Sequence, residues 1–499
     1  MTTATRLFRP TRRRLLAGLG AGAVVLGSGA RTTRAAWGEF PSGLTDAGLP
    51  PDRRVRRVLE LYMYGGMNAW DTLYCVPGWG AADHTYLHAV DSAARFAACG
   101  LPGAMTRPFA EDDAGTTIHL GPWTHPLWQR PDVLARTRVV LVRHEQLPHE
   151  TAIPLTLSGR RLGDPALAGT GAAVQRHFAE REGSRRLPWS YVLRVGDESR
   201  SDNLAAATAV GLHPAGARPL EIRLAELVRL GQLLRRDAIG DHRDALDDLV
   251  AHQLARYEDA LRRGDNRVRA PSLDAYAAST RAMAHAPELR DLVPPNAGLL
   301  TWGSACGEHG ISTPSQCAAL AAHLLTLADE PARYVQWIDR ALLPSTDGGH
   351  DTHRKHAFSA AINYPHTFEQ LLGIINTPGE HDPGKLDLDD TLIAITTEFG
   401  RSPALQPGLD GLNHWPHTTA CALIGGPVDA PAVAGYARES DGVAAQAATP
   451  AELRAALLVA LGIYPFDTGG LATSDIQGSD GDPTRALTRL ARDLLGVRP

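Results

Sequence analysis

Short apolar runs that end in glycine or polar residues recur along the chain from about residue 54. Arg56–Tyr64, Arg136–Arg143 and Asp390–Thr397 are the clearest of these runs. Runs of this length without polar alternation are typical of strands buried on both faces of a parallel sheet. Two further strands are predicted near Tyr334–Leu342 and Ala420–Ile424.

Segments with helical spacing of apolar residues alternate with these strands. The spacing predicts helices over Tyr364–Ile375 and over Ala451–Leu461, the second opened by Thr449-Pro450, a capping residue before a first-turn proline. Leu220–Leu261 also has helical spacing and gives no strand signal. The alternation predicts an α/β fold, a mostly parallel sheet sandwiched by helices, with a helical insertion at about residues 215–290.

The first 36 residues are predicted to be an export signal. Three arginines, Arg12 to Arg14, precede Leu15-Leu16 and a run of small and apolar residues over Ala17–Ala30. This order matches the twin-arginine export pattern, and an ordinary secretory signal is the alternative. The run is too short and glycine-rich to span a bilayer, which takes about 20 residues. We expect residues 37–499 to form a single domain, exported by the twin-arginine machinery to the periplasm or outside the cell and not stably inserted in the membrane.

Composition narrows the function classes further. With 50 basic and 55 acidic residues and a formal charge of −5, the chain is not expected to bind nucleic acid. Its five cysteines allow at most two disulfides, which the sequence cannot pair, and the lack of a C-x-x-C pair disfavours a zinc–thiolate site. Histidine stands out, with 20 copies.

Acidic and histidine side chains follow the ends of the predicted strands. Because the carboxyl ends of parallel strands meet at one edge of a sheet, these loops should lie together. Carboxylates and imidazoles are suitable ligands for zinc and similar divalent ions, so the pattern predicts a metal site. Each residue taken alone would more often be a loop cap or a hydrogen-bonded polar group, but five such loops at one edge together favour a site. The residues in question are Asp71, His144, His149, Asp351, His353, Glu398 and His414.

Other common chemistries lack their motifs in this sequence. There is no phosphate-binding G-x-x-x-x-G-K-[ST] loop and no G-x-S-x-G nucleophile elbow. Gly169-x-Gly171 lacks the third glycine of a dinucleotide-binding turn and follows no clear strand.

Five segments, in this order, resemble motifs of the bacterial DUF1501 family, which is placed with the alkaline phosphatase–sulfatase superfamily. The resemblance spans roughly residues 54 to 465, and a twin-arginine signal is also usual there. The segments are Leu61–Thr72 (LYMYGGMNAWDT), Val142–Gly159 (VRHEQLPHETAIPLTLSG), Gly349–His353 (GHDTH), Thr397–Ser402 (TEFGRS) and Gly411–Pro416 (GLNHWP).

The resemblance implies a superfamily core in which two neighbouring metal ions flank a nucleophile. Carried over position by position, Asp71 and Glu398 would serve one ion, and Asp351, His353 and His414 would serve the other. The expected cofactor is one or two divalent ions, zinc or calcium.

The resemblance also suggests catalytic residues. His149 falls where related sulfatases and phosphatases place their nucleophile; it could be a ligand or a nucleophile, and we favour the ligand role. Thr151, two residues on, is a second candidate nucleophile. Arg401 and Arg143 could clamp an anionic substrate, because a guanidinium matches the geometry of tetrahedral oxyanions.

Three residues depart from the family pattern. Phe399 stands where catalytic relatives often carry a histidine, Asn413 replaces an aspartate, and Asn68 occupies a position where some relatives have an acid. Fewer anionic ligands predict weaker divalent binding or a single bound ion.

Two functions are therefore open. The first is an exported, metal-dependent hydrolase that acts on a sulfate or phosphate ester of a small molecule or glycan. The second is a non-catalytic relative that serves as a carbohydrate-binding or surface-associated protein. Fold similarity does not decide between them, since function depends on the site residues.

Overall fold

The structure is a computed structural model of the 499-residue chain. It describes residues 36–80, 106–164, 168–182, 187–194, 218–224, 312–342 and 350–497, together with a few positions between 248 and 259. The predicted export signal, except for Ala36, and most of the predicted insertion at 215–290 lie outside the described residues.

A central sheet of eight strands organises the fold, in the order β12-β4-β11-β8-β1-β7-β5-β6. Neighbouring strands are parallel, except that β11 runs antiparallel to both β4 and β8. The strands are β1 (Arg57–Met63), β4 (Thr137–Val142), β5 (Ser190–Arg194), β6 (Leu220–Arg223), β7 (Tyr334–Asp339), β8 (Thr391–Thr396), β11 (Thr419–Gly425) and β12 (Ala432–Ala434). The predicted α/β fold with a mostly parallel sheet is confirmed.

Each of the five predicted strands forms close to its predicted ends, as β1, β4, β7, β8 and β11. The prediction of a helix over Leu220–Leu261 is wrong at its start, because Leu220–Arg223 form β6 and pair in parallel with β5. Four residues are too few for apolar spacing to separate a strand from a helix. The described positions between 248 and 259 are helical.

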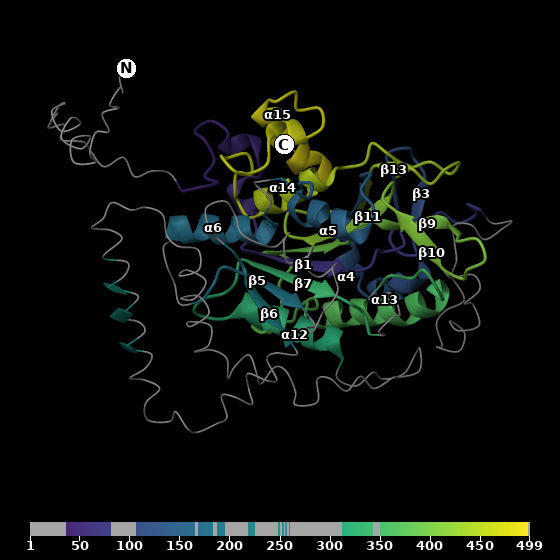
Figure 1. The fold of residues 1–499 in the computed structure, drawn as a ribbon, viewed down its shortest axis with the longest axis horizontal. Coiled ribbons are helices and arrows are strands. Elements are labelled where there is room, and N and C mark those ends of the chain that lie inside the picture. The colour runs from purple at the N-terminus through teal and green to yellow at the C-terminus, as the bar shows by residue number, and fades with distance from the viewer. Residues whose placement is uncertain are drawn as a thin grey trace, which may run out of the picture. The chain divides into compact units, whose positions relative to one another are not determined.

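Helices cover both faces of the sheet (Figure 1). The described residues also contain three antiparallel pairs of short strands and four short 3-10 helical turns. On one face lie α5 (His149–Ser158), α6 (Thr170–Glu182), α14 (Pro450–Ala460), α15 (Pro483–Arg489) and a π-helical turn (Leu490–Leu494); on the other lie α3 (His125–Trp128), α4 (Pro131–Leu134), α12 (Thr313–Thr326) and α13 (His356–Gly373). The strand pairs are β2 (Arg107–Glu111) with β3 (Thr117–Leu120), β9 (Gly400–Leu405) with β10 (Leu412–Trp415), and β13 (Tyr436–Ala437) with β14 (Ala444–Ala445); the turns are Thr45–Ala47, Pro51–Arg53, Pro122–Thr124 and Thr473–Asp475.

Both predicted helices form. α14 begins with Thr449, whose side chain accepts a hydrogen bond from the Glu452 amide in a capping box. α13 begins at His356, eight residues before the predicted start, and continues through Pro365. Among the helices that the structure describes, none combines the length and apolarity needed to cross a membrane.

Alternate side chains of the central strand β1 enter different cores, as the two-residue period of a strand requires. Leu59 and Leu61 pack into a cluster with residues of α12 and α13. Val58 packs into a second cluster with residues of α6, α14 and α15. Cys75, Cys317 and Cys421 are buried and free; Cys99 and Cys306 lie outside the described residues.

One charged side chain lies in the middle of this apolar sheet. Glu60 of β1 is fully buried, and its Oε2 lies 2.6 Å from a guanidinium nitrogen of Arg454 on α14. Thr396 of β8 donates to Oε1 at 2.5 Å, and Tyr334 and Gln336 of β7 donate to Oε2. Burial alone would raise the pKa of Glu60, but Arg454 and these hydrogen bonds outweigh it and lower that pKa. One carboxylate thus joins three adjacent strands to the helix above them.

Removing this carboxylate should destabilise the fold strongly. Glu60→Ala leaves the Arg454 guanidinium buried without its counter-ion, and breaking such a pair costs about 3–5 kcal/mol. Urea unfolding measures the loss of unfolding free energy. The matched control is Asp429→Ala, which breaks the exposed pair with Arg53 and should cost less than about 1 kcal/mol. Equal losses in the two variants would contradict the role given to Glu60.

Candidate metal centre

Strands β1, β4, β7 and β8 are parallel, so their carboxyl ends lie at one edge of the sheet. The loops that follow them carry most of the predicted site residues. His149 is the first residue of α5, which follows β4, and Glu398 comes directly after β8. Asp351 lies in the segment between β7 and α13, and His414 lies in β10.

Three of these side chains converge on one point. His149, Asp351 and His414 each offer a ligand atom, and the three atoms lie within 4.8 Å of one another. Nε2 of His149 is 3.4 Å from Oδ2 of Asp351, and Nε2 of His414 is 3.7 Å from Oδ1. His353 adds a fourth group, with Nε2 3.3 Å from Oδ1 of Asp351 and 2.8 Å from Nε2 of His414.

These distances fit a small divalent ion. Tetrahedral zinc with bonds of about 2.0–2.1 Å places neighbouring ligand atoms about 3.3 Å apart. The two nitrogen–oxygen distances within this group, 3.4 Å from His149 and 3.7 Å from His414, are close to that spacing. Nε2 of His149 is buried and makes no hydrogen bond to the described residues. A buried imidazole nitrogen of this kind, facing a carboxylate and two further imidazoles, is what a zinc site requires before the ion enters.

Glu398 fixes the orientation of the His149 ring. Its Oε1 lies 2.8 Å from Nδ1 of His149, and the same oxygen accepts the amide N–H of Gly65 at 2.7 Å. The Thr397 hydroxyl lies 3.1 Å from Oε2. Because Glu398 holds Nδ1, the other ring nitrogen of His149 faces Asp351, an arrangement typical of a carboxylate that supports a metal-binding histidine.

His144 contacts the main chain of Glu398. His144 donates from Nε2 to the main-chain oxygen of Glu398 at 2.7 Å, while its Nδ1 accepts the amide N–H of Gln146 at 3.1 Å. One nitrogen donates and the other accepts, so the ring is neutral. Burial lowers the pKa of His144, which favours the same neutral form.

The ionisable side chains of the centre shift one another's pKa values. Burial alone would lower the pKa of His149, but the neighbouring carboxylates of Asp351 and Glu398 outweigh burial and raise the pKa to about 9. Burial lowers the pKa of His414 to about 4. Burial would raise the pKa of Asp351, but the neighbouring imidazoles of His149 and His414 and the charge of Arg401 hold it well below its usual range.

Arg401 is fully buried behind Asp351. One guanidinium nitrogen pairs with the Asp351 carboxylate and donates to the Gly65 carbonyl, and another donates to the Leu412 carbonyl at 3.1 Å. Arg401 was predicted to clamp substrate, but the structure leaves it unexposed. Arg143, the other predicted clamp, is exposed and lies 3.1 Å from Glu145.

Asp71 lies apart from the converging residues. Its fully buried carboxylate is 3.1 Å from Nε2 of His356, which is also 3.2 Å from the Asn68 side chain. Nδ1 of His356 is 2.7 Å from the Thr352 hydroxyl. The contacts of the described residues thus join Asp71 to His356 and Glu398 to His149, and do not bring the two carboxylates together.

An aromatic wall closes one side of the centre. The buried Phe399 ring lies 4.8 Å from the His149 ring and 4.3 Å from the His414 ring, measured between centroids. The Asn413 side chain accepts the amide N–H of His414 at 2.9 Å. Phe399 therefore provides an apolar surface where the resemblance implies a polar ligand.

Thr151 is placed less favourably as a nucleophile. It lies in the first turn of α5, and its hydroxyl donates to the Pro148 carbonyl at 3.1 Å. The contacts described for this hydroxyl are with its own turn and not with the carboxylates.

Two supporting residues were not identified as such from the sequence. His356 follows Asp351 and His353 at a spacing that indicates a cluster, but its pairing with Asp71 depends on how distant loops fold. Gln406 donates from its side chain to Nδ1 of His353 at 3.0 Å. It lies in the turn after β9, and no motif marks it.

Comparison with known proteins gives one family. Residues 385–470 match the family described as "Protein of unknown function (DUF1501)". This match supports the DUF1501 family. The segment that matches DUF1501 runs from before β8 to ten residues past the end of α14 and contains Glu398, Arg401 and His414. No curated protein and no solved structure matches the chain.

Two glycines allow the loops of the centre to meet main chain to main chain. Gly65 has φ +113°, and a Cβ there would overlap the amide nitrogen of Asp351. A Cβ at Gly411 would overlap the main chain of His353. The glycine-containing motifs therefore set the spacing between Asp351, His353 and the strands beside them.

Gly65→Ala should disrupt both stability and the metal centre. The added methyl group must displace Asp351, so we expect a loss of at least about 3 kcal/mol in unfolding free energy and weaker metal retention. The control is Gly163→Ala, at φ +93° with open space around it, which should cost about 1–2 kcal/mol and leave metal binding intact. Metal analysis and urea unfolding on both variants provide the test. Full metal content in Gly65→Ala would show that the close contact is not needed.

Proposed function

We propose that this protein is an exported hydrolase of sulfate or phosphate esters that uses a single divalent ion held by His149, Asp351 and His414. The convergence of these three residues carries the proposal. Two imidazoles and a carboxylate favour zinc over calcium, which prefers an all-oxygen shell of 6–8 ligands. The proposal includes twin-arginine export, which rests on Arg12 to Leu16 in the sequence.

The partial exposure of the histidine side chains favours a catalytic ion over a structural one. The side chains of His149 and His414 are 13% and 14% exposed, and that of His353 is 26% exposed. In this proposal the substrate approaches from the side of His353, the most exposed of these three imidazoles. A catalytic zinc site keeps one position for water or substrate, whereas a structural site is closed by protein ligands.

The surrounding residues hold the ligands in place. Glu398 orients His149 through Nδ1, so its role in this proposal is support and not direct ligation. Arg401 balances the charge of Asp351 from the buried side and keeps that carboxylate ionised and fixed. Both residues act through a ligand and are positioning residues.

When bound, the ion would polarise the ester and lower the pKa of a water molecule beside it. His353 lies next to the ligand atoms and is the most exposed imidazole of the group. Gln406 holds its Nδ1, so Nε2 faces the centre. In this proposal His353 carries a proton to the leaving oxygen as the ester breaks.

A metal-binding protein without catalysis is the second candidate, and two observations favour it. Phe399 fills the side of the centre where a second polar ligand is implied, and Asp71 is engaged with His356. Both contacts reduce the ligands available to a second ion. A single ion without turnover would make the protein a binding or surface-associated component.

Metal analysis tests the ligand set first. The mature protein should bind about one equivalent of zinc, and His414→Ala should weaken binding by on the order of 100-fold or more, because a direct ligand is lost. The matched control is His417→Ala, which removes an imidazole three residues away that pairs with Glu145. Competition with a chromophoric chelator measures both affinities. Equal affinities in wild type and His414→Ala would refute the assignment.

Turnover tests the hydrolase proposal separately. Zinc-loaded protein should hydrolyse an aryl phosphate or an aryl sulfate, and removal of the ion by a chelator should abolish the rate. His353→Ala should lower kcat by about 10²–10⁴-fold while zinc content is retained. A protein that binds zinc but turns over neither ester would exclude this hydrolase and leave the binding function.

A further inference from the structure

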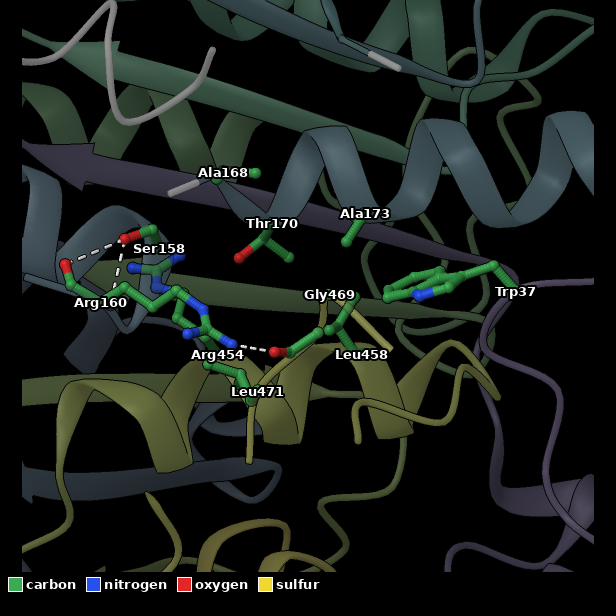
Figure 2. A pocket seen from close by; sticks show the side chains of 12 residues that line it. Trp37, Ser158, Arg160, Ala168, Thr170, Ala173, Arg454, Leu458, Gly469 and Leu471 are labelled. Carbon is green, nitrogen blue, oxygen red and sulfur yellow. Dashed lines mark hydrogen bonds between the residues drawn. The ribbon is translucent and has the colours of Figure 1, made fainter. Parts of the chain in front are cut away.

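A small cavity lies at the opposite end of α5 from the metal centre. It has a volume of about 30 Å³, room for one or two water-sized groups, and Figure 2 shows the side chains on its wall. The wall comes from the end of α5, the start of α6 and the side of α14, together with Trp37 and the segment 469–471. Its polar residues are Trp37, Ser158, Arg160, Thr170 and Arg454.

Arg454 contributes unused hydrogen-bond donors to this wall. Its side chain is fully buried, and one terminal nitrogen pairs with Glu60. Nε and the other terminal nitrogen make no hydrogen bond to the described residues. Leaving buried guanidinium N–H groups without an acceptor is costly, so an acceptor in the cavity would relieve that cost.

The start of α6 adds further donors. Thr170 is the first residue of this 13-residue helix, and its hydroxyl is buried and likewise makes no hydrogen bond to the described residues. The first amide N–H groups of a helix have no acceptor within it, and the helix dipole places partial positive charge there. The helix start and the Arg454 guanidinium therefore face the same small cavity.

The charged residues that line the cavity indicate which ligand charge it can hold. It contains two arginines, and none of the described residues that line it is acidic. Arg454 pairs with Glu60, and Arg160 lies 3.1 Å from Asp164, so most of the arginine charge is already balanced. What remains is the partial charge of the helix and several N–H and O–H donors. This balance suits a singly charged anion better than a divalent oxyanion.

From these observations we propose that the cavity binds a small inorganic monoanion of the size of chloride. The anion accepts hydrogen bonds from Arg454, from the Thr170 hydroxyl and from the amides of Thr170 and Gly171, since the Ala172 and Ala173 amides already donate to the Gly169 carbonyl. The Ser158 hydroxyl does not contribute, because it donates to the Pro154 carbonyl at 2.6 Å and accepts from the Arg160 amide. The site is independent of the proposed hydrolase activity.

Halide-dependent stability tests the site on the full mature protein. At constant ionic strength, replacing gluconate with chloride or bromide should raise Tm along a saturating curve, by on the order of 2–5 °C. Thr170→Val should reduce the apparent halide affinity at least about 5-fold. Crystals soaked in bromide should show anomalous density between Arg454 and Thr170.

The matched control is Thr419→Val, because Thr419 also has a buried hydroxyl without a hydrogen bond to the described residues but does not line the cavity. It should keep the wild-type halide curve. Equal Tm in gluconate and chloride, or the same halide curve in Thr170→Val as in wild type, would show that the cavity holds water only. Circular dichroism establishes that both variants are folded.

Discussion

The ion pair between Arg401 and Asp351 is the interaction on which the metal centre depends. Asp351 lies among three imidazoles in a buried setting, where an isolated carboxylate would lose much of its hydration energy. The fully buried Arg401 guanidinium supplies the opposite charge and, with the same side chain, binds the carbonyls of Gly65 and Leu412. The pair therefore keeps the carboxylate ionised and holds together the loops after β1 and β9. Without it, the imidazoles would have no common anionic partner.

Much of the fold could be predicted from apolar patterning. The runs that became β1, β4 and β8 are buried on both faces, so they lack polar alternation and are easily recognised. β6 was missed because four residues at the sheet edge carry little periodic signal. The predicted start of α13 at Tyr364 puts Pro365 in the first turn, where a proline is tolerated. In the structure the helix begins at His356 and continues through Pro365, so the proline does not mark its start.

The site could be predicted in part, and for a physical reason. Parallel strands deliver their following loops to one edge, so the sequence could group the acidic and histidine residues after the strands, among them the converging His149, Asp351 and His414. Which residues then pair is decided by short-range packing that no spacing encodes. Asp71 contacts His356 and Glu398 contacts His149, because the loops approach each other through glycines and not in chain order.

Main chain contacts main chain at Gly65 and Gly411, and this limits which parts of the fold can change among related sequences. The separation of the ligating loops is set by peptide geometry, which does not change when side chains are exchanged. Phe358 and Leu409, which lie near these loops in the sequence, have exposed side chains. Relatives built this way can acquire new outer surfaces, and with them new binding preferences, while the inner architecture is inherited intact.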